Sequence, residues 1–314
     1  MQGLQGLRAV APALLALALL AGGSLPAHAQ EPVAGRGGVP PPDLVLAHLN
    51  QLQPKLLRAE VAGLLPHRKG ETDIYAIGVS GWATLDVFAK EVDGGLAAIG
   101  KVLPIKGRTV RLINSPATAV NLPLATPHNF ESAVHDVGAL MDKKRDVLLL
   151  FLTSHGDRNG VALQLPDRIV DLTPKEVAAT FKREGITNRV VIVSACFSGT
   201  FVPPLQNSNT IVMTAADADH TSFGCAPERD WTYFGDAFFR QALEPGTDFQ
   251  SAFEHARVLI EGWELMDRVA PSNPQGFFGP ALVAKLAPFF AAPPASAGSS
   301  TASRDPAHPS PRAQ

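Results

Sequence analysis

The sequence predicts an α/β domain in which helices cover both faces of a mostly parallel sheet. Short, continuously apolar runs, typical of strands buried on both faces, alternate with segments whose apolar residues recur every three or four positions, as in helices. Strands joined by crossover helices run parallel in one sheet. The chain has 314 residues, 46% of them hydrophobic, which is enough to bury one large core. We therefore expect a single three-layer α/β/α sandwich.

This domain is predicted to span residues 43–290, between two segments of low complexity. Residues 30–42 are rich in Gly and Pro, and residues 291–314 in Pro, Ala and Ser, so both are expected to be disordered. The formal net charge is −2, with both signs spread along the chain. The charge pattern therefore gives no indication that the protein binds nucleic acid.

The amino-terminal segment, residues 1–29, has the pattern of a signal peptide. A single cation, Arg8, precedes an apolar run, and small residues lie one and three positions before Gln30. We expect cleavage near Ala29–Gln30 and a mature protein exported to the periplasm or secreted. A retained membrane anchor is the alternative, but the apolar run is shorter than the roughly 20 residues that span a bilayer.

The first half of the domain is predicted to hold a leading helix and three strands. Residues 43–62 carry a helical pattern that we expect Pro54 to interrupt. After the strand at residues 73–79, apolar residues at helical spacing predict a helix packed on the sheet: Leu85, Phe88, Val92, Leu96 and Ile99. The next predicted elements are a strand at residues 109–113, a helix at 130–141 and a strand that begins at 146 and ends at His155.

The second half continues the alternation. Residues 161–165 suggest a hairpin strand, and Thr173 with Pro174 forms a good helix start. The remaining predicted elements are a strand at 189–196, a strand at 210–216, and aromatic-rich helices at 231–243 and 249–266.

Two strands of this pattern end on residues that can do chemistry. One ends at His155, followed by Gly156, and the other at Cys196. Function in parallel sheets gathers at the carboxyl ends of the strands, so neighbouring strands would bring the two side chains to one rim. An imidazole there can remove the thiol proton and later protonate a leaving amine. The backbone amides of Gly156 and Cys196 could form an oxyanion hole, worth roughly 3 kcal/mol per donor.

Plainer interpretations compete with this one. A buried cysteine at a strand end is usually an unreactive core residue. In an exported protein, Cys196 and Cys225 could also form a disulfide. His220 is the competing candidate for the base. Asp217, Asp219 and His220 resemble a fragment of a metal site, but the cluster has no distant ligand.

Four motifs in order resemble the legumain-like cysteine peptidases, which include legumain and the catalytic subunit of the GPI-anchor transamidase, and more distantly the caspases. The match is closest to the exported or membrane-linked bacterial branch. The motifs are LFLTSHG at residues 150–156, IVSACFSG at 192–199, MTAADADHTSFGC at 213–225 and WTYFG at 231–235. The resemblance implies a caspase-like fold, with His155 as the catalytic histidine, Cys196 as the nucleophile, and Gly156 and Cys196 as the oxyanion amides.

The same resemblance implies which residues line the pocket for the substrate residue before the scissile bond. Thr221, Ser222 and Asp236 match family pocket residues. Ser194 stands where legumain has an acid two positions before its cysteine, and Asp86 falls where legumain has an arginine in its specificity pocket. Legumain's preference for asparagine is therefore not transferred, and a basic or small polar residue is expected instead.

Two smaller matches complete the comparison with legumain. Cys225 matches a shared cysteine, which argues against a disulfide with the nucleophile, and Thr84 replaces an asparagine near the histidine.

The sequence therefore predicts a cysteine endopeptidase that acts on protein or peptide substrates without a metal or cofactor. A transamidase or ligase would use the same Cys196–His155 pair. A catalytically silent binding module on the same fold is the alternative from another class.

Overall fold

The computed structural model describes residues 41–291 of the chain. The predicted signal peptide at residues 1–29, most of the linker at 30–42 and the tail after residue 291 lie outside this range and stay predictions. Within the described range, no helix is both long enough and apolar enough to cross a membrane.

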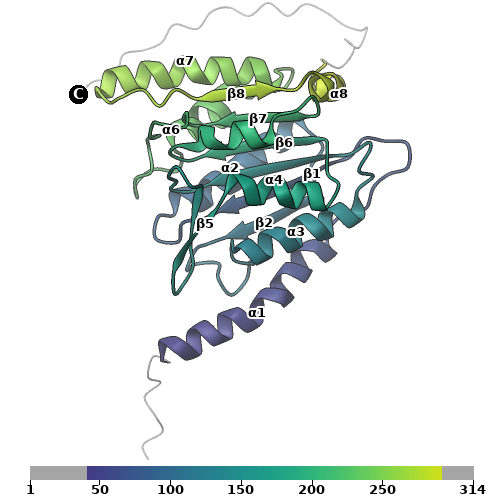
Figure 1. Cartoon of the computed structure of the whole chain (residues 1–314), viewed down its shortest axis with the longest axis vertical. Helices are drawn as coiled ribbons and strands as arrows, with labels where there is room; N and C mark the ends of the chain where they lie inside the picture. Colours follow the sequence, from purple (N-terminus) through teal and green to yellow (C-terminus); the bar gives the residue numbers. More distant parts are fainter. Residues whose placement is uncertain (1–40, 292–314) are drawn as a thin grey trace, which may run out of the picture. The chain divides into compact units, whose positions relative to one another are not determined.

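A six-stranded sheet forms the middle layer, with the strand order β2-β1-β3-β6-β7-β8 (Figure 1). Every pairing is parallel except that of β7 with β8, which is antiparallel and lies at one edge. The mostly parallel sheet predicted from the continuous apolar runs is thus confirmed. The strand bounds are β1 Ile74–Ser80, β2 Thr109–Ile113, β3 Val147–Thr153, β6 Arg189–Ser194, β7 Thr210–Thr214 and β8 Gln275–Phe278.

Helices pack against both faces of this sheet and give the expected three layers. Successive side chains of a strand point to opposite faces; Leu149 and Phe151 of β3 therefore enter one apolar core, and Leu148 and Leu150 the other. The first core is covered by α2 (Val87–Val102), α6 (Tyr233–Gly235), η2 (Asp236–Ala242), α7 (Phe249–Asp267) and α8 (Pro280–Phe290). The second is covered by α1 (Pro42–Ala62), α3 (Pro127–Leu140), α4 (Pro174–Arg183) and α5 (Val202–Leu205).

The expected interruption of the first helix at Pro54 is wrong, since α1 continues through it. The proline removes one backbone donor from the helix, but side chains on both sides of it are held by the domain. Gln53 is buried and accepts a hydrogen bond from the Leu124 amide at 2.8 Å, and Leu57 lies in the core. These tertiary contacts outweigh the local loss.

Two regions differ in detail from the predicted pattern. The hairpin expected near residue 161 is present as β4 (Val161–Gln164) paired with β5 (Ile169–Leu172). The helix expected at residues 231–243 is instead a single turn, α6, followed by the π-helix η2, in which the Leu243 amide donates to the Phe238 carbonyl five residues earlier.

Candidate active site

The two predicted catalytic residues lie on adjacent strands at matching positions. Thr153 and Ser194, the last residues of β3 and β6, are paired across the two parallel strands. His155 and Cys196 each follow two residues later, so they lie at the same rim of the sheet. The expectation that these strands are neighbours pointing the same way is confirmed.

Aromatic rings hold the His155 imidazole in place. Trp82 lies edge-on to it with ring centroids 4.6 Å apart, and Phe88, in the first turn of α2, lies edge-on at 5.2 Å. Burial between them lowers the pKa of His155, which favours the neutral imidazole that a general base requires. Among the residues the structure describes, no carboxylate hydrogen-bonds this ring.

The loop that follows β7 surrounds the Cys196 thiol. The Ser222 amide donates to Sγ at 3.3 Å, and the Ser222 hydroxyl lies 3.7 Å from Sγ. The thiol also donates to the Ser222 carbonyl at 3.6 Å, so this one residue contacts the sulfur through three groups. Cys196 and Cys225 are both free and half-buried, so the alternative of a disulfide between them is not realised.

The chain turns sharply directly after Cys196. Phe197 has φ 57° and ψ 16°, a left-handed conformation that is unfavourable for a residue with a Cβ. Two contacts hold it there: its amide donates to the His220 carbonyl at 2.8 Å, and the Arg158 guanidinium lies 5.3 Å from its ring centroid. The turn leaves Cys196 at the tip of a bend.

Two backbone amides beside the thiol have no acceptor. Within residues 41–291, neither the Gly156 amide nor the Cys196 amide donates a hydrogen bond to backbone or side chain. The Gly156 backbone packs so closely on the nucleophile turn that a Cβ there would lie 2.6 Å from the Cys196 carbonyl oxygen and 3.1 Å from Ala195 Cβ. A glycine is therefore required, and its amide stays available to an incoming oxyanion.

A buried glutamate that the sequence reasoning missed lies beneath this pair. Glu91 of α2 is fully buried, and its carboxylate accepts hydrogen bonds from the hydroxyls of Thr153 and, at 2.5 Å, Thr232. The Ser194 hydroxyl lies 3.5 Å from it. Burial raises the pKa of Glu91 to about 7, although these donors oppose the shift.

The predicted pocket residues occupy different positions. Ser222 contacts the thiol, and Thr221 is exposed in the same loop. The expectation for Ser194 is corrected, because its side chain is 1% exposed and faces Glu91 below the cleft.

The two predicted pocket acids are both paired. Asp236 is buried, and its carboxylate accepts from Arg240 at 2.7 Å and from Gln241, so it presents no free charge to a substrate. Asp86 is exposed at the start of α2 and forms an ion pair with Lys90 at 2.9 Å. Lys90 also pairs with Asp230 in the loop before α6, at 3.0 Å.

The competing base, His220, is held by its own acid. Its Nδ1 lies 2.7 Å from Asp217 Oδ1, and Asn273 donates to the same carboxylate. These contacts, together with the Asp219 amide, keep the pKa of Asp217 low despite partial burial. The fragment of a metal site seen in the sequence is thus a hydrogen-bonded loop.

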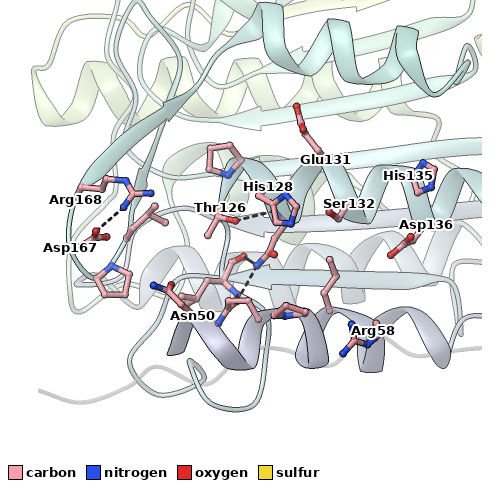
Figure 2. A pocket seen from close by; sticks show the side chains of 18 of the residues that line it. Asn50, Arg58, Thr126, His128, Glu131, Ser132, His135, Asp136, Asp167 and Arg168 are labelled. Carbon is pink, nitrogen blue, oxygen red and sulfur yellow. Dashed lines mark hydrogen bonds and ion pairs between the residues drawn. The ribbon is translucent and has the colours of Figure 1, made fainter. Parts of the chain in front are cut away.

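A large groove of about 800 Å³ lies away from this site, between α1, α3 and the turn after β4 (Figure 2). Its lining includes neither His155 nor Cys196. Several of its charged residues pair with one another: Arg168 with Asp167 at 2.7 Å, and His135 with Glu184 at 3.0 Å. The groove offers no reactive pair.

Helical spacing could have revealed Glu91. It lies three residues after Phe88 and one before Val92, on the face of the predicted helix that carries its apolar residues. A carboxylate on a buried helix face signals a partner or a function. Trp82 and Thr232, which lie in loops, carried no comparable periodic signal.

Comparisons with known proteins extend these observations. Residues 128–277, from α3 to β8, match the family model described as the peptidase C13 family. The fold is similar to caspase-1 from Spodoptera frugiperda at 12% identity, covering 69% of this chain and 94% of that one, with a TM-score of 0.46. No curated protein matches the chain at a significant level.

Proposed function

We propose that this chain, which matches the peptidase C13 family model over residues 128–277, is a cysteine endopeptidase. The family implies protein or peptide substrates. One observation carries the proposal: His155 and Cys196 extend from paired positions on adjacent parallel strands, beside two backbone amides with no acceptor among the described residues.

In the first step, the Cys196 sulfur attacks the carbonyl carbon of the scissile peptide bond. His155 takes the thiol proton, an S–C bond forms, and the carbonyl oxygen becomes an oxyanion. The Gly156 and Cys196 amides would donate to that oxygen, each contributing roughly 3 kcal/mol to the transition state. The C–N bond then breaks as His155 gives its proton to the leaving amine, which leaves a thioester.

In the second step, His155 removes a proton from water, which attacks the thioester carbon. The C–S bond breaks, the acid product leaves, and the proton returns to the sulfur. Neutral imidazole is needed at the start of both steps, and the burial of His155 between Trp82 and Phe88 favours this form.

The test is covalent labelling of the mature protein with a thiol-directed peptide electrophile, followed by mass spectrometry of the digest. We expect the adduct on Cys196 and its loss in His155→Ala. Cys225 provides the internal control, because burial raises the pKa of its thiol and makes it less reactive. An adduct on Cys225 with Cys196 untouched would overturn the assignment.

Product analysis separates hydrolysis from transamidation by the same pair. Peptide substrates incubated with and without an added amine should give the free acid as the main product in both cases. A product joined to the amine would identify a transamidase. Peptides left intact under reducing conditions from acid to mildly alkaline pH would favour a binding module instead.

The site of action is proposed to be outside the cytoplasm, following cleavage of the predicted signal peptide near Ala29–Gln30. Fractionation of expressing cells, with the amino terminus of the protein identified by mass spectrometry, tests this. A cytoplasmic protein that retains residue 1 would contradict it.

A further inference from the structure

Glu91 is an acid buried on the sheet-facing side of α2. Its neighbours on this face, Phe88 and Val92, are core residues, and Glu91 itself is fully buried. Within residues 41–291 no Lys, Arg or His forms an ion pair with it. A buried carboxylate without a cation is unfavourable, so its retention needs a reason.

Hydroxyl groups on neighbouring strands lie directly below the catalytic pair. Ser80, Thr153 and Ser194 end β1, β3 and β6 and are paired with one another across the sheet. Thr153 and Ser194 end their strands two positions before His155 and Cys196. Glu91 accepts from the Thr153 hydroxyl and lies 3.5 Å from that of Ser194, so it contacts both strands two residues before the reacting groups.

The far side of the carboxylate is closed by the start of α6. The Thr232 hydroxyl donates to Glu91 Oε1 at 2.5 Å, lies 3.0 Å from the Ser194 hydroxyl and caps α6 by accepting from the Gly235 amide. A Cβ on Gly235 would overlap Glu91 Oε1, so the chain leaves room for the acid there. The carboxylate thus joins α2, α6 and the ends of two central strands.

We propose that Glu91 is a positioning residue for the Cys196–His155 pair. Its carboxyl group joins the ends of β3 and β6 two residues before the reacting groups, and its change of charge alters the reactivity of the thiol. This inference rests on the proposed peptidase function. The pKa of Glu91, raised to about 7, supports it, since the carboxyl then changes charge near neutral pH.

The charge at Glu91 should affect reactions of the Cys196 thiol. A negative charge near the reacting sulfur repels negative charge that develops there, so we expect the alkylation rate to respond when Glu91 ionises. Titratable groups on the elements packed around Glu91 include His155, Cys225, Tyr233 of α6, Lys90 of α2, and Asp236, which is paired with Arg240. Cys225 senses Glu91 too, as the carboxylate is one of the causes that raise its pKa.

The experiment measures the rate of Cys196 alkylation by iodoacetamide from pH 5 to 9.5, in a Cys225→Ala background that leaves one thiol. In the parent, the rate should deviate from a single ionisation near pH 7. Glu91→Gln keeps the shape of the side chain and one acceptor oxygen but cannot ionise, so we expect this inflection to vanish. Glu264→Gln, which changes a buried acid on α7 that accepts from the Ser272 amide, is the matched control and should leave the curve unchanged.

A second variant keeps the proposal testable if Glu91→Gln does not fold. Thr153→Val removes one donor to the carboxylate without changing its size, which raises the pKa of Glu91 and should move the inflection to higher pH. A curve with the same inflection in either variant as in the parent overturns the proposal, since a purely structural acid would change rates equally at every pH.

The labelling results distinguish failure of the proposed function from failure of the proposed role of Glu91. If the peptide electrophile does not label Cys196 in the parent, the peptidase assignment fails. If it labels Cys196 in the parent and the Glu91→Gln curve is unchanged, only the role of Glu91 fails.

Discussion

The two ends of the parallel strands, called here the amino edge and the carboxyl edge, both carry clusters of titratable groups. The two clusters differ in how their charges are compensated. At the amino edge, Asp73 and Asp146 precede β1 and β3, and the donor atoms of His67 and both acids lie within 4.8 Å of one another. Arg68 and Arg108 pair with Asp73 at 2.8 and 3.2 Å. Two guanidinium groups that face this cluster would repel a bound cation. The cluster therefore fits a structural ion-pair network better than a metal site.

At the carboxyl edge, the groups nearest the predicted catalytic residues have no charged partner, although acids farther out, such as Asp236 and Asp86, are paired. Among the described residues, Glu91 has hydroxyl partners only, His155 has aromatic neighbours, and two amides have no acceptor. The pKa values differ accordingly. Hydrogen bonds and ion pairs with its partners lower the pKa of Asp73 despite its burial, whereas burial raises the pKa of Glu91. We expect the compensated groups to stabilise the fold, and the groups without charged partners to be the ones available for proton transfer.

Cys196→Ala should reduce kcat/KM for peptide cleavage by at least about 1000-fold, because no other group can form the thioester. The free energy of unfolding should change by less than about 1 kcal/mol, since the side chain is half-buried and its loss leaves no charge unpaired. Cys225→Ala is the control and should retain most of the activity. Steady-state kinetics measure the activity and urea unfolding measures the stability. Comparable activity in the two variants would contradict the assignment of Cys196 as the nucleophile.

Glu91→Gln should change how stability depends on pH. An acid whose folded pKa is raised from 4.5 to about 7 stabilises the folded state fully below pH 4.5, and this contribution is lost as pH rises through 7. The difference in unfolding free energy between parent and variant should therefore fall by about 3 kcal/mol between pH 4 and 8. Glu261→Gln, on the exposed side of α7, should give a flat difference in the same urea titrations. A flat difference for Glu91→Gln would show that its carboxyl is not desolvated.

Asp146→Asn should destabilise the protein by roughly 2 to 3 kcal/mol without changing the activity of the folded fraction. Its carboxylate is fully buried and accepts from the amides of Asp73 and Asp142 at 2.9 and 2.8 Å. An amide can serve these donors with one oxygen only. β3 separates it from the site by about 20 Å. Asp167→Asn, at an exposed pair, is the control for unfolding, and a fall in kcat/KM per folded molecule would show that the two edges are coupled.

His155 should set the acid limb of the pH–rate profile. Its pKa is lowered from 6.5 by burial, so kcat/KM should reach half its maximum below pH 6.5 as pH falls. Trp82→Ala exposes the ring and should move this limb toward 6.5, while Trp263→Ala, which removes a ring that contacts Tyr233, should not. A limb above 6.5 in the parent would mean that the thiolate stabilises imidazolium more than burial opposes it.

The sequence was informative wherever a pattern repeats or a strand ends. Continuous apolar runs predicted the strands β1, β3, β6 and β7, all of which are fully buried. The rule that parallel strands present their carboxyl ends at one rim was enough to bring His155 and Cys196 together.

Contacts between distant segments could not be read in this way. Glu91 meets Thr232 across 141 positions of the sequence, and Trp82 reaches His155 from a loop. Pro54 shows the reverse error, in which a local rule predicts a break that tertiary packing prevents. Side-chain pairing also decides whether a predicted pocket acid can bind a substrate. Asp236, for example, forms an ion pair with Arg240.

Asp86→Asn should have the smallest effect and tests the last predicted pocket acid. Asp86 is 57% exposed and paired with Lys90, so its charge is both screened and matched, and such pairs contribute about 0.5 kcal/mol. The ratio of kcat/KM for substrates with a basic and a neutral residue before the scissile bond should change by less than about threefold. Lys90→Met frees Asp86 and Asp230 together and should raise that ratio in favour of basic residues. A positional-scanning peptide library measures both. A tenfold fall in Asp86→Asn would show that Asp86 leaves Lys90 to bind the substrate, and that charge at the carboxyl edge is compensated only until a peptide arrives.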